Sequence, residues 1–111
     1  MMKQLSVFAE NKKGAINDIT KELADANINL YALLTNDSSA FAIVRMIVSD
    51  TEKAQEILKK QYLTHLDSVL AVRVSNEVGS LNRLLEDVKE CNINIDYLYT
   101  TFGWDTPQPI M

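Results

Sequence analysis

Two loops of the sequence share a pattern of residue types that suits the binding of a small zwitterion. Each reads Asn-x-x-Gly, at Asn11–Gly14 and at Asn76–Gly79, between an extended segment and a helical pattern. A glycine at the mouth of a helix lets a ligand approach the backbone, because it has no Cβ atom. Unpaired N–H groups of the first helical turn attract a carboxylate, and the asparagine oxygen can accept a hydrogen bond from an ammonium group. The alternative is that each pair of residues only caps a helix and closes a turn.

The loops belong to a longer internal repeat, which is clearest in ANINLYALLT at 26–35 and CNINIDYLYT at 91–100. Residues 4–35 align with residues 69–100 at a constant offset of 65 positions, without an insertion. Two amphipathic helices can match apolar positions by chance, but they do not also place a glycine and four asparagines in register. We interpret this long period as the duplication of a small domain. The identical pairs are Leu5/Leu70, Val7/Val72, Asn11/Asn76, Gly14/Gly79, Asn17/Asn82, Asn27/Asn92, Ile28/Ile93, Asn29/Asn94, Leu33/Leu98 and Thr35/Thr100.

The first copy begins with a strand, a helix and a second strand. Residues 3–10 alternate between apolar and polar side chains, which is typical of a half-buried strand. The period then changes to that of a helix, which begins at Gly14 and ends near Asn27. Residues 28–35 predict the second strand. A slip in its apolar register after Leu30 predicts a bulge or bend there, and the same slip predicts one after Ile95 in the second copy. The buried face of the helix is expected to consist of Ile16, Ile19, Leu23 and Ala26.

A hairpin and a second helix complete the first copy. A polar turn at 36–39 precedes an almost wholly apolar segment at 40–48, which predicts an interior strand. Ser49 and Glu52 have the spacing of a capping box and predict the start of a helix, and a short strand at 61–65 follows it. The order βαββαβ predicts an α+β fold: a ferredoxin-like sandwich whose antiparallel sheet carries both helices on one face. The second helix is expected to bury Ala54, Ile57 and Leu58.

The second copy repeats only the first half of this order. We expect a strand at 69–75, a helix at 79–91 and a strand at 93–102. The remaining elements are missing from this copy, so either the chain is truncated or a partner subunit completes the sheet. We therefore divide the chain into a first domain, 1–67, and an incomplete second domain, 68–111. The helix of the second copy is expected to bury Leu81, Leu84, Val88 and Cys91.

The composition argues against several classes of protein. The net charge of −4 and the pI near 4.9, with scattered basic residues, argue against nucleic-acid binding. No stretch is long and apolar enough to span a membrane, and the N-terminus turns polar too early for a signal peptide. A single cysteine, Cys91, cannot form an internal disulfide, which favours the cytoplasm. The lone His65 cannot make a metal site and no catalytic constellation is visible, so we predict a protein without cofactor that is not an enzyme.

The order of these motifs resembles the ACT domain. The resemblance rests on the strand, the Asn-x-x-Gly loop, the helix, the Ile-Asn-Leu or Ile-Asn-Ile segment, the hairpin and the strand that leads into SDTEKA at 49–54. It covers 4–66 as a full domain and 69–102 as half of one, and the pair of copies is similar to the small tandem ACT-domain proteins of bacteria. The usual loop of the family is Asp/Asn-x-Pro-Gly; this chain keeps the glycine in both loops and the proline in neither. The resemblance implies a module that binds amino acids and reports on them to enzymes or transcription factors.

The resemblance also implies where a ligand sits. In paired ACT domains the ligand lies between two copies, with the loop of one facing the second strand of the other, which implies a homodimer or another homo-oligomer. The alternative for Asn29 and Asn94 is that they only satisfy an exposed strand edge. Carried over residue by residue, one site consists of Asn11, Lys13, Gly14, Ala15 and Ile16 with Asn94 and Ile95, and the other of Asn76, Val78, Gly79, Ser80 and Leu81 with Asn29 and Leu30.

Two functions remain open at this point. The first is a sensor that binds a small amino acid or a similar metabolite and signals its occupancy to a partner, and the retained loops favour it. The second is a ligand-free oligomerisation or docking module for an enzyme or regulator, and the missing prolines and the unfinished second copy favour it. Lys12 and Lys13 are suited to attract a carboxylate and Glu77 to repel one, so two sites would be unequal, unless these charges are only solvated loop residues.

Overall fold

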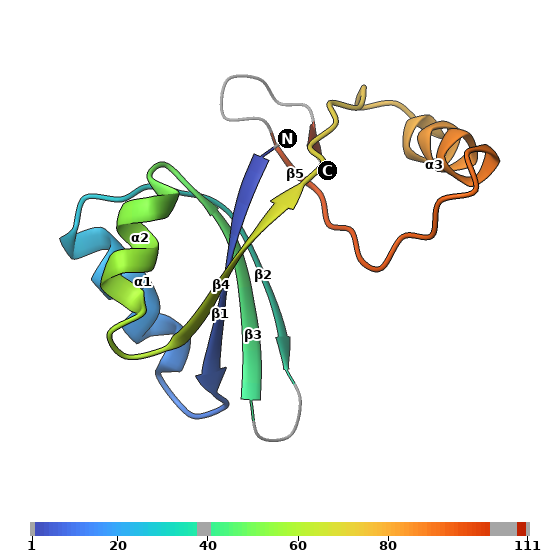
Figure 1. Cartoon of the computed structure of the whole chain (residues 1–111). Coiled ribbons are helices and arrows are strands. Elements are labelled where there is room, and N and C mark those ends of the chain that lie inside the picture. The colour runs from blue at the N-terminus through green and yellow to red at the C-terminus, as the bar shows by residue number, and fades with distance from the viewer. Residues whose placement is uncertain (1, 38–40, 103–108, 111) are drawn as a thin grey trace. The chain divides into compact units, whose positions relative to one another are not determined.

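The computed structural model describes residues 2–37, 41–102 and 109–110. The chain divides into two compact units, a first unit at Met1–Val69 and a second unit at Leu70–Met111. Within the described residues, the first unit holds a complete βαββαβ order, and the second holds a helix followed by two short strands (Figure 1).

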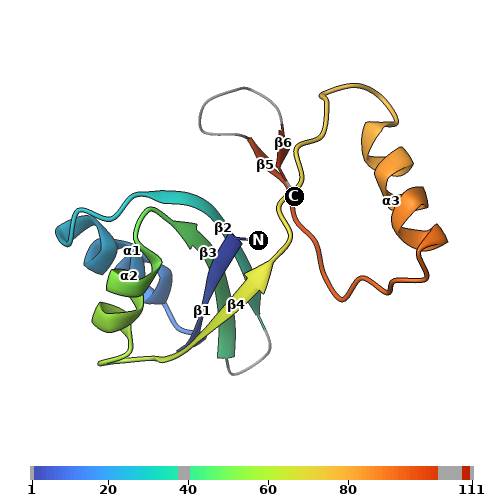
Figure 2. The same ribbon diagram turned by 45° about the horizontal axis from the view of Figure 1, so that its top comes forward.

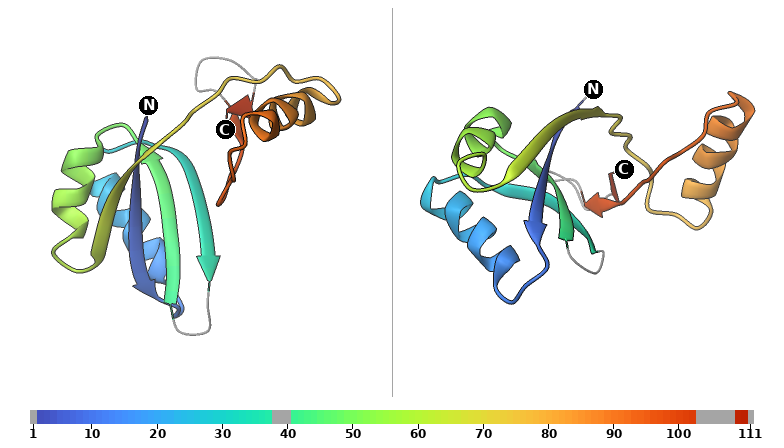
Figure 3. Two further views of the ribbon diagram at one scale, coloured as in Figure 1. Left: turned by 45° about the vertical axis from the view of Figure 1, so that its right-hand side comes forward. Right: turned by 60° about the horizontal axis from the view of Figure 1, so that its bottom comes forward.

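The first unit is an antiparallel sheet with its helices on one face. Its elements are β1 (Met2–Glu10), α1 (Ala15–Asp25), β2 (Leu30–Asp37), β3 (Phe41–Val48), α2 (Thr51–Leu58) and β4 (Leu63–Val69). The strands lie in the order β2-β3-β1-β4, so the apolar strand β3 is in the interior of the sheet, as predicted. Both helices cover the same face of the sheet (Figure 2; Figure 3, right). The predicted ferredoxin-like sandwich is therefore confirmed.

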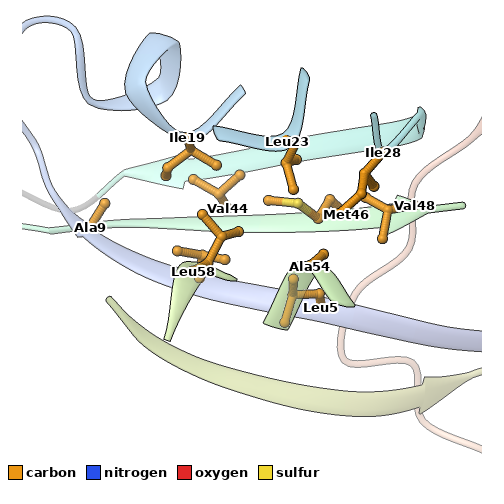
Figure 4. Close-up of a cluster of buried hydrophobic side chains, with 11 residues drawn as sticks. Leu5, Ala9, Ile19, Leu23, Ile28, Val44, Met46, Val48, Ala54 and Leu58 are labelled. Carbon is orange, nitrogen blue, oxygen red and sulfur yellow. The ribbon is translucent and has the colours of Figure 1, made fainter. Parts of the chain in front are cut away.

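The core of the first unit lies between the sheet and its helices. Leu5, Val7 and Ala9 alternate along β1 and are buried on the face towards the helices. Ile19 and Leu23 extend from α1 into the same space (Figure 4). Because burial of each large aliphatic side chain stabilises a fold by about 1.5–3 kcal/mol, this cluster fixes the helices on the sheet. The other members of the cluster are Ile28, Val44, Met46, Val48, Ala54 and Leu58.

The predicted buried face of α1 was wrong at its first residue. Ile16 is 40% exposed, and Ala15 is buried in its place. The buried stripe follows every fourth residue from Ala15 through Ile19 to Leu23, and Ile16 lies to one side of it. This leaves the Ile16 side chain at the surface beside the Asn-x-x-Gly loop.

The predicted bulge in the second strand is confirmed. The pairing of β2 with β3 shifts register between Leu30 and Ala32, which places Tyr31 in the bulge. The strand begins at Leu30, two residues later than predicted, and Ile28 is buried before the strand starts. It continues to Asp37, into the predicted turn, and positions 38 and 39 of that turn lie outside the described residues.

The predicted capping box at the start of α2 was wrong by one residue. The N-cap is Asp50, whose carboxylate accepts a hydrogen bond of 3.1 Å from the Lys53 amide. The Ser49 hydroxyl instead accepts a hydrogen bond of 2.9 Å from the Asn29 amide, at the start of the neighbouring strand. Serine and aspartate are both good caps, so spacing alone could not choose between them.

Two predicted strands of the repeat are also wrong. Val69, the predicted start of the strand at 69–75, is the last residue of β4 and pairs with Met2. Residues 70–75, all described, form no strand beyond a single bridge at Arg73. Of the predicted strand at 93–102, only β5 (Thr101–Phe102) forms, and it pairs with β6 (Pro109–Ile110). Strand backbone needs a neighbouring strand for its N–H and C=O groups, and in the described part of the second unit these segments pair only at the Arg73 bridge and in β5. The bulge or bend predicted after Ile95 does not form in a strand, because Ile95 lies in none.

The helix of the second copy is confirmed, but its burial is not. It forms α3 (Ser80–Glu90), one residue shorter at each end than predicted. Leu81, Leu84 and Val88 are only partly buried, and Cys91, expected in a core, is exposed. An amphipathic helix needs a second layer to cover its apolar face. Among the described residues of the second unit, that layer does not form.

Candidate ligand-binding loops

The first Asn-x-x-Gly loop connects β1 to α1. Gly14 has a φ of 85°, in the left-handed region where other residues are strained. The Lys12 amide donates to the Glu10 carbonyl over 2.9 Å, and the Ala15 amide donates to the Lys12 carbonyl over 3.2 Å. A Cβ atom added to Gly14 would meet no other atom within 4 Å. The backbone conformation therefore favours glycine at this position, and the space beside it is open.

The second loop has the same backbone conformation. Gly79 has a φ of 86° and precedes α3. The Glu77 amide donates to the Ser75 carbonyl over 2.9 Å, and the Ser80 amide donates to the Glu77 carbonyl over 3.2 Å. These bonds match those of the first loop in position and length. The duplicated sequence thus builds the same helix entrance in both units.

The side chains beside the helix entrance differ between the two loops. The hydroxyl oxygens of Ser80 and Ser75 lie 2.8 Å apart in a hydrogen bond, and the Arg83 guanidinium donates to the Ser80 hydroxyl over 3.1 Å. Another Arg83 nitrogen lies 3.4 Å from the position that a Cβ atom of Gly79 would take. Arg83 was not predicted from the sequence to lie at this loop, although its position three residues after Ser80 places both on one helix face. Asp18 occupies the equivalent position in α1.

Arg83 changes the charge expected at the second loop. We expected Glu77 to repel a carboxylate there, but a guanidinium lies directly beside the glycine. At the first loop, the Lys12 ammonium lies 3.7 Å from the Glu10 carboxylate, so part of its charge is offset. The sequence indicated that charges at the first loop attract a carboxylate and that Glu77 at the second loop repels one. The side chains seen in the structure do not support this difference between the loops.

The asparagines of the repeated Ile-Asn segments are held differently. The Asn29 amide donates to the Ser49 hydroxyl, and the Asn29 carbonyl accepts from the Ser49 amide, both over 2.9 Å. The Asn29 side chain is exposed beyond this pair of bonds. Asn94 and Ile95 are exposed and lie in no strand, and no bond of this kind holds Asn94 within the described part of the chain. One asparagine is thus fixed at a sheet end and the other is not.

Within the first unit, the loop and the second-strand residues lie at opposite ends of the sheet. Glu10, next to the loop, pairs with Phe41 at the start of β3. Asn29 bonds to Ser49, just after the end of β3. A strand of this length spans about 25 Å. The Asn11–Ile16 and Asn29–Leu30 sets are therefore not brought together within one unit.

A hollow beside the first loop was not anticipated from the sequence. It lies at the end of the sheet where β1 ends and α1 begins, and its volume is about 380 Å³. Apolar and charged side chains share its lining. The lining includes Lys12 and Ala15 of the loop and helix start, together with Phe8, Glu10, Asp18, Phe41, Tyr62 and Leu63.

Other titratable groups form surface contacts. The His65 ring lies 3.0 Å from the Asp67 carboxylate on β4. A hydrogen bond to the Asp25 carboxylate, and the charge of that group, raise the pKa of Lys21. No group of three or more His, Cys, Asp or Glu side chains among the described residues could hold a metal ion. No described helix is both long and apolar enough to cross a bilayer.

Comparison with known families matches residues 1–105 to the model of the ACT domain pair. The chain belongs to the ACT-domain family. This family consists of regulatory ligand-binding modules, not of catalytic domains. A similar solved structure, titled the crystal structure of protein BT0572 from Bacteroides thetaiotaomicron, shares 34% sequence identity at a TM-score of 0.89. The match covers 98% of this ACT-domain chain and 76% of that one. A search of curated proteins found no match.

Proposed function

We propose that the protein is a non-catalytic regulatory module that binds a small amino acid or a similar metabolite and signals its occupancy to a partner protein. Membership of the ACT-domain family supports the regulatory, ligand-binding class. The observation that carries the proposal is the pair of loops, in which Gly14 and Gly79 hold φ values of 85° and 86° at the entrance of a helix. Both loops thus present their backbone groups in one conformation, and each loop begins with an asparagine.

Each loop offers two kinds of group to a zwitterion. The amides of Ile16 and Leu81 belong to first helical turns, where N–H groups have no acceptor within the helix and the helix dipole favours a carboxylate. The side chains of Asn11 and Asn76 carry amide oxygens, which accept hydrogen bonds from an ammonium group. An α-amino acid carries both charges on neighbouring atoms, so it suits this entrance better than a simple anion does.

We propose that each ligand also contacts a second copy, in the same chain or in another subunit. Asn29 lies at the far end of the sheet from the Asn11–Gly14 loop, so a ligand that touches both types of residue needs two copies. A homodimer is the simplest assembly. The proposed sites are Asn11, Lys13, Gly14, Ala15 and Ile16 with Asn94 and Ile95, and Asn76, Val78, Gly79, Ser80 and Leu81 with Asn29 and Leu30.

A ligand between copies provides a route for signalling. It stabilises the packing in which both copies contact it, by as much as its affinities for the alternative packings differ. The partner that reads this change is proposed to be an enzyme or a transcription regulator. The free thiol of Cys91 suits a reducing compartment, so we propose that the protein acts in the cytoplasm.

Isothermal titration with the standard amino acids tests this function. We expect saturable binding of one amino acid and a higher melting temperature in its presence. Gly14→Val should abolish binding at the first loop, because a β-branched residue is strained at a φ of 85°. Gly14→Asn is the matched control, because Asn27 and Asn92 already adopt φ values of 59° and 58° in this chain. A folded wild-type dimer that binds no amino acid at millimolar concentration would contradict the proposal.

A ligand-free oligomerisation or docking module is the second candidate, and exposed apolar side chains in the second unit favour it. Leu70 is 68% exposed and Ile93 is 59% exposed, whereas their equivalents Leu5 and Ile28 are buried. Apolar surface of this kind marks sites of protein interaction. This function predicts assembly that depends on protein concentration and not on amino acids, which sedimentation analysis with and without ligand distinguishes from the first candidate.

A further inference from the structure

We propose that the open face of the first unit's sheet binds an organic carboxylate, with the anionic group at Arg45 and Ser6 and an apolar body on the neighbouring side chains. The open face is the one that α1 and α2 leave uncovered (Figure 3, right). None of the residues of this site belongs to the proposed amino-acid sites. The proposal therefore goes beyond the proposed function and does not rest on it.

Strand register places the polar side chains of this site in one row. Ser6 of β1 pairs with Arg45 of β3 on one side and with His65 of β4 on the other. Directly paired residues point to the same face of an antiparallel sheet, and successive residues of a strand point to opposite faces. Leu5 and Val7, which flank Ser6 in β1, are buried in the core under the helices. The hydroxyl, the guanidinium and the imidazole therefore share the open face.

Ser6 is the smallest and most buried side chain of this row. The residue is only 4% exposed, and larger side chains flank it on both neighbouring strands. Its hydroxyl has no hydrogen-bond partner among the residues that the structure describes. Every fully buried side-chain oxygen or nitrogen in that part of the chain has a partner, so the Ser6 oxygen belongs to the small exposed fraction. A carboxylate oxygen that reaches this position can accept a hydrogen bond from the hydroxyl.

Arg45 supplies the positive charge of the site. Its guanidinium donates to the Asn36 amide oxygen over 3.1 Å, with the amide oriented so that both of its groups are hydrogen-bonded. A guanidinium has five N–H donors in a planar fork, so it can bind a carboxylate through two bonds and keep such a neutral partner. Arg45 is only partly exposed, which strengthens its interaction with an anion. The His65 ring lies 3.0 Å from the Asp67 carboxylate, so the guanidinium is the main cation of the row.

The charge and the apolar border of the site select the class of ligand. Leu34 pairs with Arg45 on the outer strand β2, and Ile43 lies two residues from Arg45 along β3, so both share its face. Both side chains are partly exposed and offer apolar surface to a ligand body. A phosphate monoester carries nearly two negative charges, and the Asp67 carboxylate on the same face disfavours the second. A monocarboxylate with an aromatic or aliphatic body therefore fits this face better than a phosphate does.

Titration with phenylacetate, followed by amide chemical shifts in NMR, tests the proposal. We expect saturable binding, with the largest shifts at Ser6, Arg45 and their neighbours on the open face. 2-Phenylethylamine has the same ring and the opposite charge, so it should bind more weakly. The proposal would be overturned by equal binding of the acid and the amine, by shifts confined to the loops at Gly14 and Gly79, or by the absence of shifts at millimolar concentrations.

Substitutions of Arg45 distinguish a binding site from a merely hydrated sheet face. Arg45→Gln removes the charge and should weaken phenylacetate binding by about tenfold or more. Arg45→Lys keeps the charge without the planar fork, so it should restore part of the affinity. Lys89→Gln on the exposed side of α3 changes the net charge equally and should leave the affinity unchanged. Equal effects of Arg45→Gln and Lys89→Gln would show that only the net charge matters and would overturn the proposal.

Ser6→Ala tests the hydroxyl separately. It should weaken phenylacetate binding by about threefold, as expected for the loss of one hydrogen bond. It should leave the melting temperature of the ligand-free protein nearly unchanged, because the hydroxyl has no partner to lose within the described chain. Unchanged affinity in Ser6→Ala, or a large loss of stability, would show that the hydroxyl does not serve a ligand and would overturn its place in the site.

The loops provide the control that separates this site from the proposed amino-acid sites. Ser6 lies five residues before Asn11, which corresponds to about 17 Å along a strand. Gly14→Val and Gly79→Val should therefore weaken amino-acid binding and leave the phenylacetate shifts at Ser6 and Arg45 intact. Arg45→Gln should do the reverse. If no amino acid binds the wild-type protein, the phenylacetate titration still decides the open-face site. Loss of the open-face shifts in both glycine variants would show a shared site and would overturn the proposal.

Discussion

The two units share their local structure but not their sheet. In both, an asparagine ends the helix in the left-handed region, Asn27 at a φ of 59° and Asn92 at 58°. The Asn27 amide donates to the Ala24 carbonyl over 3.0 Å, and the Asn92 amide donates to the Lys89 carbonyl over 2.9 Å. The amide of the following isoleucine reaches one residue further back in each helix, which completes a Schellman motif. The repeated asparagine therefore has a structural role in both copies, at the helix end.

The strands that follow these caps differ. Residues 30–37 form β2 by pairing with residues 41–48, whereas the equivalent residues 95–102 form a strand only at Thr101–Phe102. A helix and its caps satisfy their backbone groups within about a dozen residues, but a strand needs a distant segment to pair with. The nearly identical segments 26–35 and 91–100 therefore form the same helix end but different strands. The difference lies in the neighbours that each segment has.

The largest expected difference between the two units comes from truncating equivalent apolar side chains of their helices. Ile19→Ala should lower the free energy of unfolding by about 2–5 kcal/mol, because Ile19 is fully buried. Its equivalent in α3 is Leu84, which is only partly buried, and Leu84→Ala should cost less than about 1 kcal/mol. Urea denaturation followed by circular dichroism measures both. Equal costs would show that the second unit has a core of its own in solution.

The caps provide a smaller and more local test. Asn27→Ala should destabilise the first unit by about 1 kcal/mol, because alanine is disfavoured in the left-handed region. Asn27→Gly is the control and should be nearly neutral. Asn92→Ala should remove a similar amount of local stability, visible as faster hydrogen exchange at the end of α3, without a change in the unfolding of the first unit. If Asn92→Ala shifted that unfolding, the two units would not be independent.

Asn29 and Asn94, which follow the asparagines at the helix ends, differ in one hydrogen bond. Ser49→Ala removes the hydroxyl that accepts from the Asn29 amide over 2.9 Å and should cost about 1 kcal/mol. The Asn29 amide should then exchange with solvent at a rate closer to that of Asn94. Ser49→Thr keeps the hydroxyl and should restore protection. Unchanged exchange in Ser49→Ala would mean that this bond does not hold the strand start.

Sequence patterns predicted the parts of the structure that are decided locally or by a single buried face. The helices, the interior strand at 40–48, the bulge after Leu30 and the turn at Asn27 all follow from spacing and residue type. The patterns failed where two choices had equal local merit, as for Ser49 and Asp50 at the start of α2, and where a strand had no partner, as at 93–102.

Part of the candidate site was predictable for the same reason. The two Asn-x-x-Gly loops before a helix were predicted from the sequence, and the structure adds the left-handed conformation of their glycines. The guanidinium of Arg83 beside Gly79 and the hollow beside the first loop depend on how side chains from separate elements meet.

The smallest expected effect concerns charge along the two helices. In α1, the Lys21 ammonium lies 3.0 Å from the Asp25 carboxylate, whereas the equivalent residues of α3 are Glu86 and Glu90, which repel each other. Glu90→Lys should therefore strengthen α3 by roughly 0.3–0.5 kcal/mol, measured as slower amide exchange near its end. Glu90→Gln is the control, because it removes the repulsion without adding an attraction, and it should give a smaller effect.

The pH dependence of the natural pair follows from the raised pKa of Lys21, which its hydrogen bond to Asp25 causes. A raised pKa means that the folded state favours the ammonium form, so the contribution is present below the ordinary value of 10.5 and is lost as pH rises through the raised value. Both side chains are largely exposed, so salt should weaken the pair as well. The difference in melting temperature between the wild-type protein and Lys21→Gln should shrink above that pH and at high salt. A difference that stays constant across the range would show that Lys21 acts through its aliphatic chain and not through its charge.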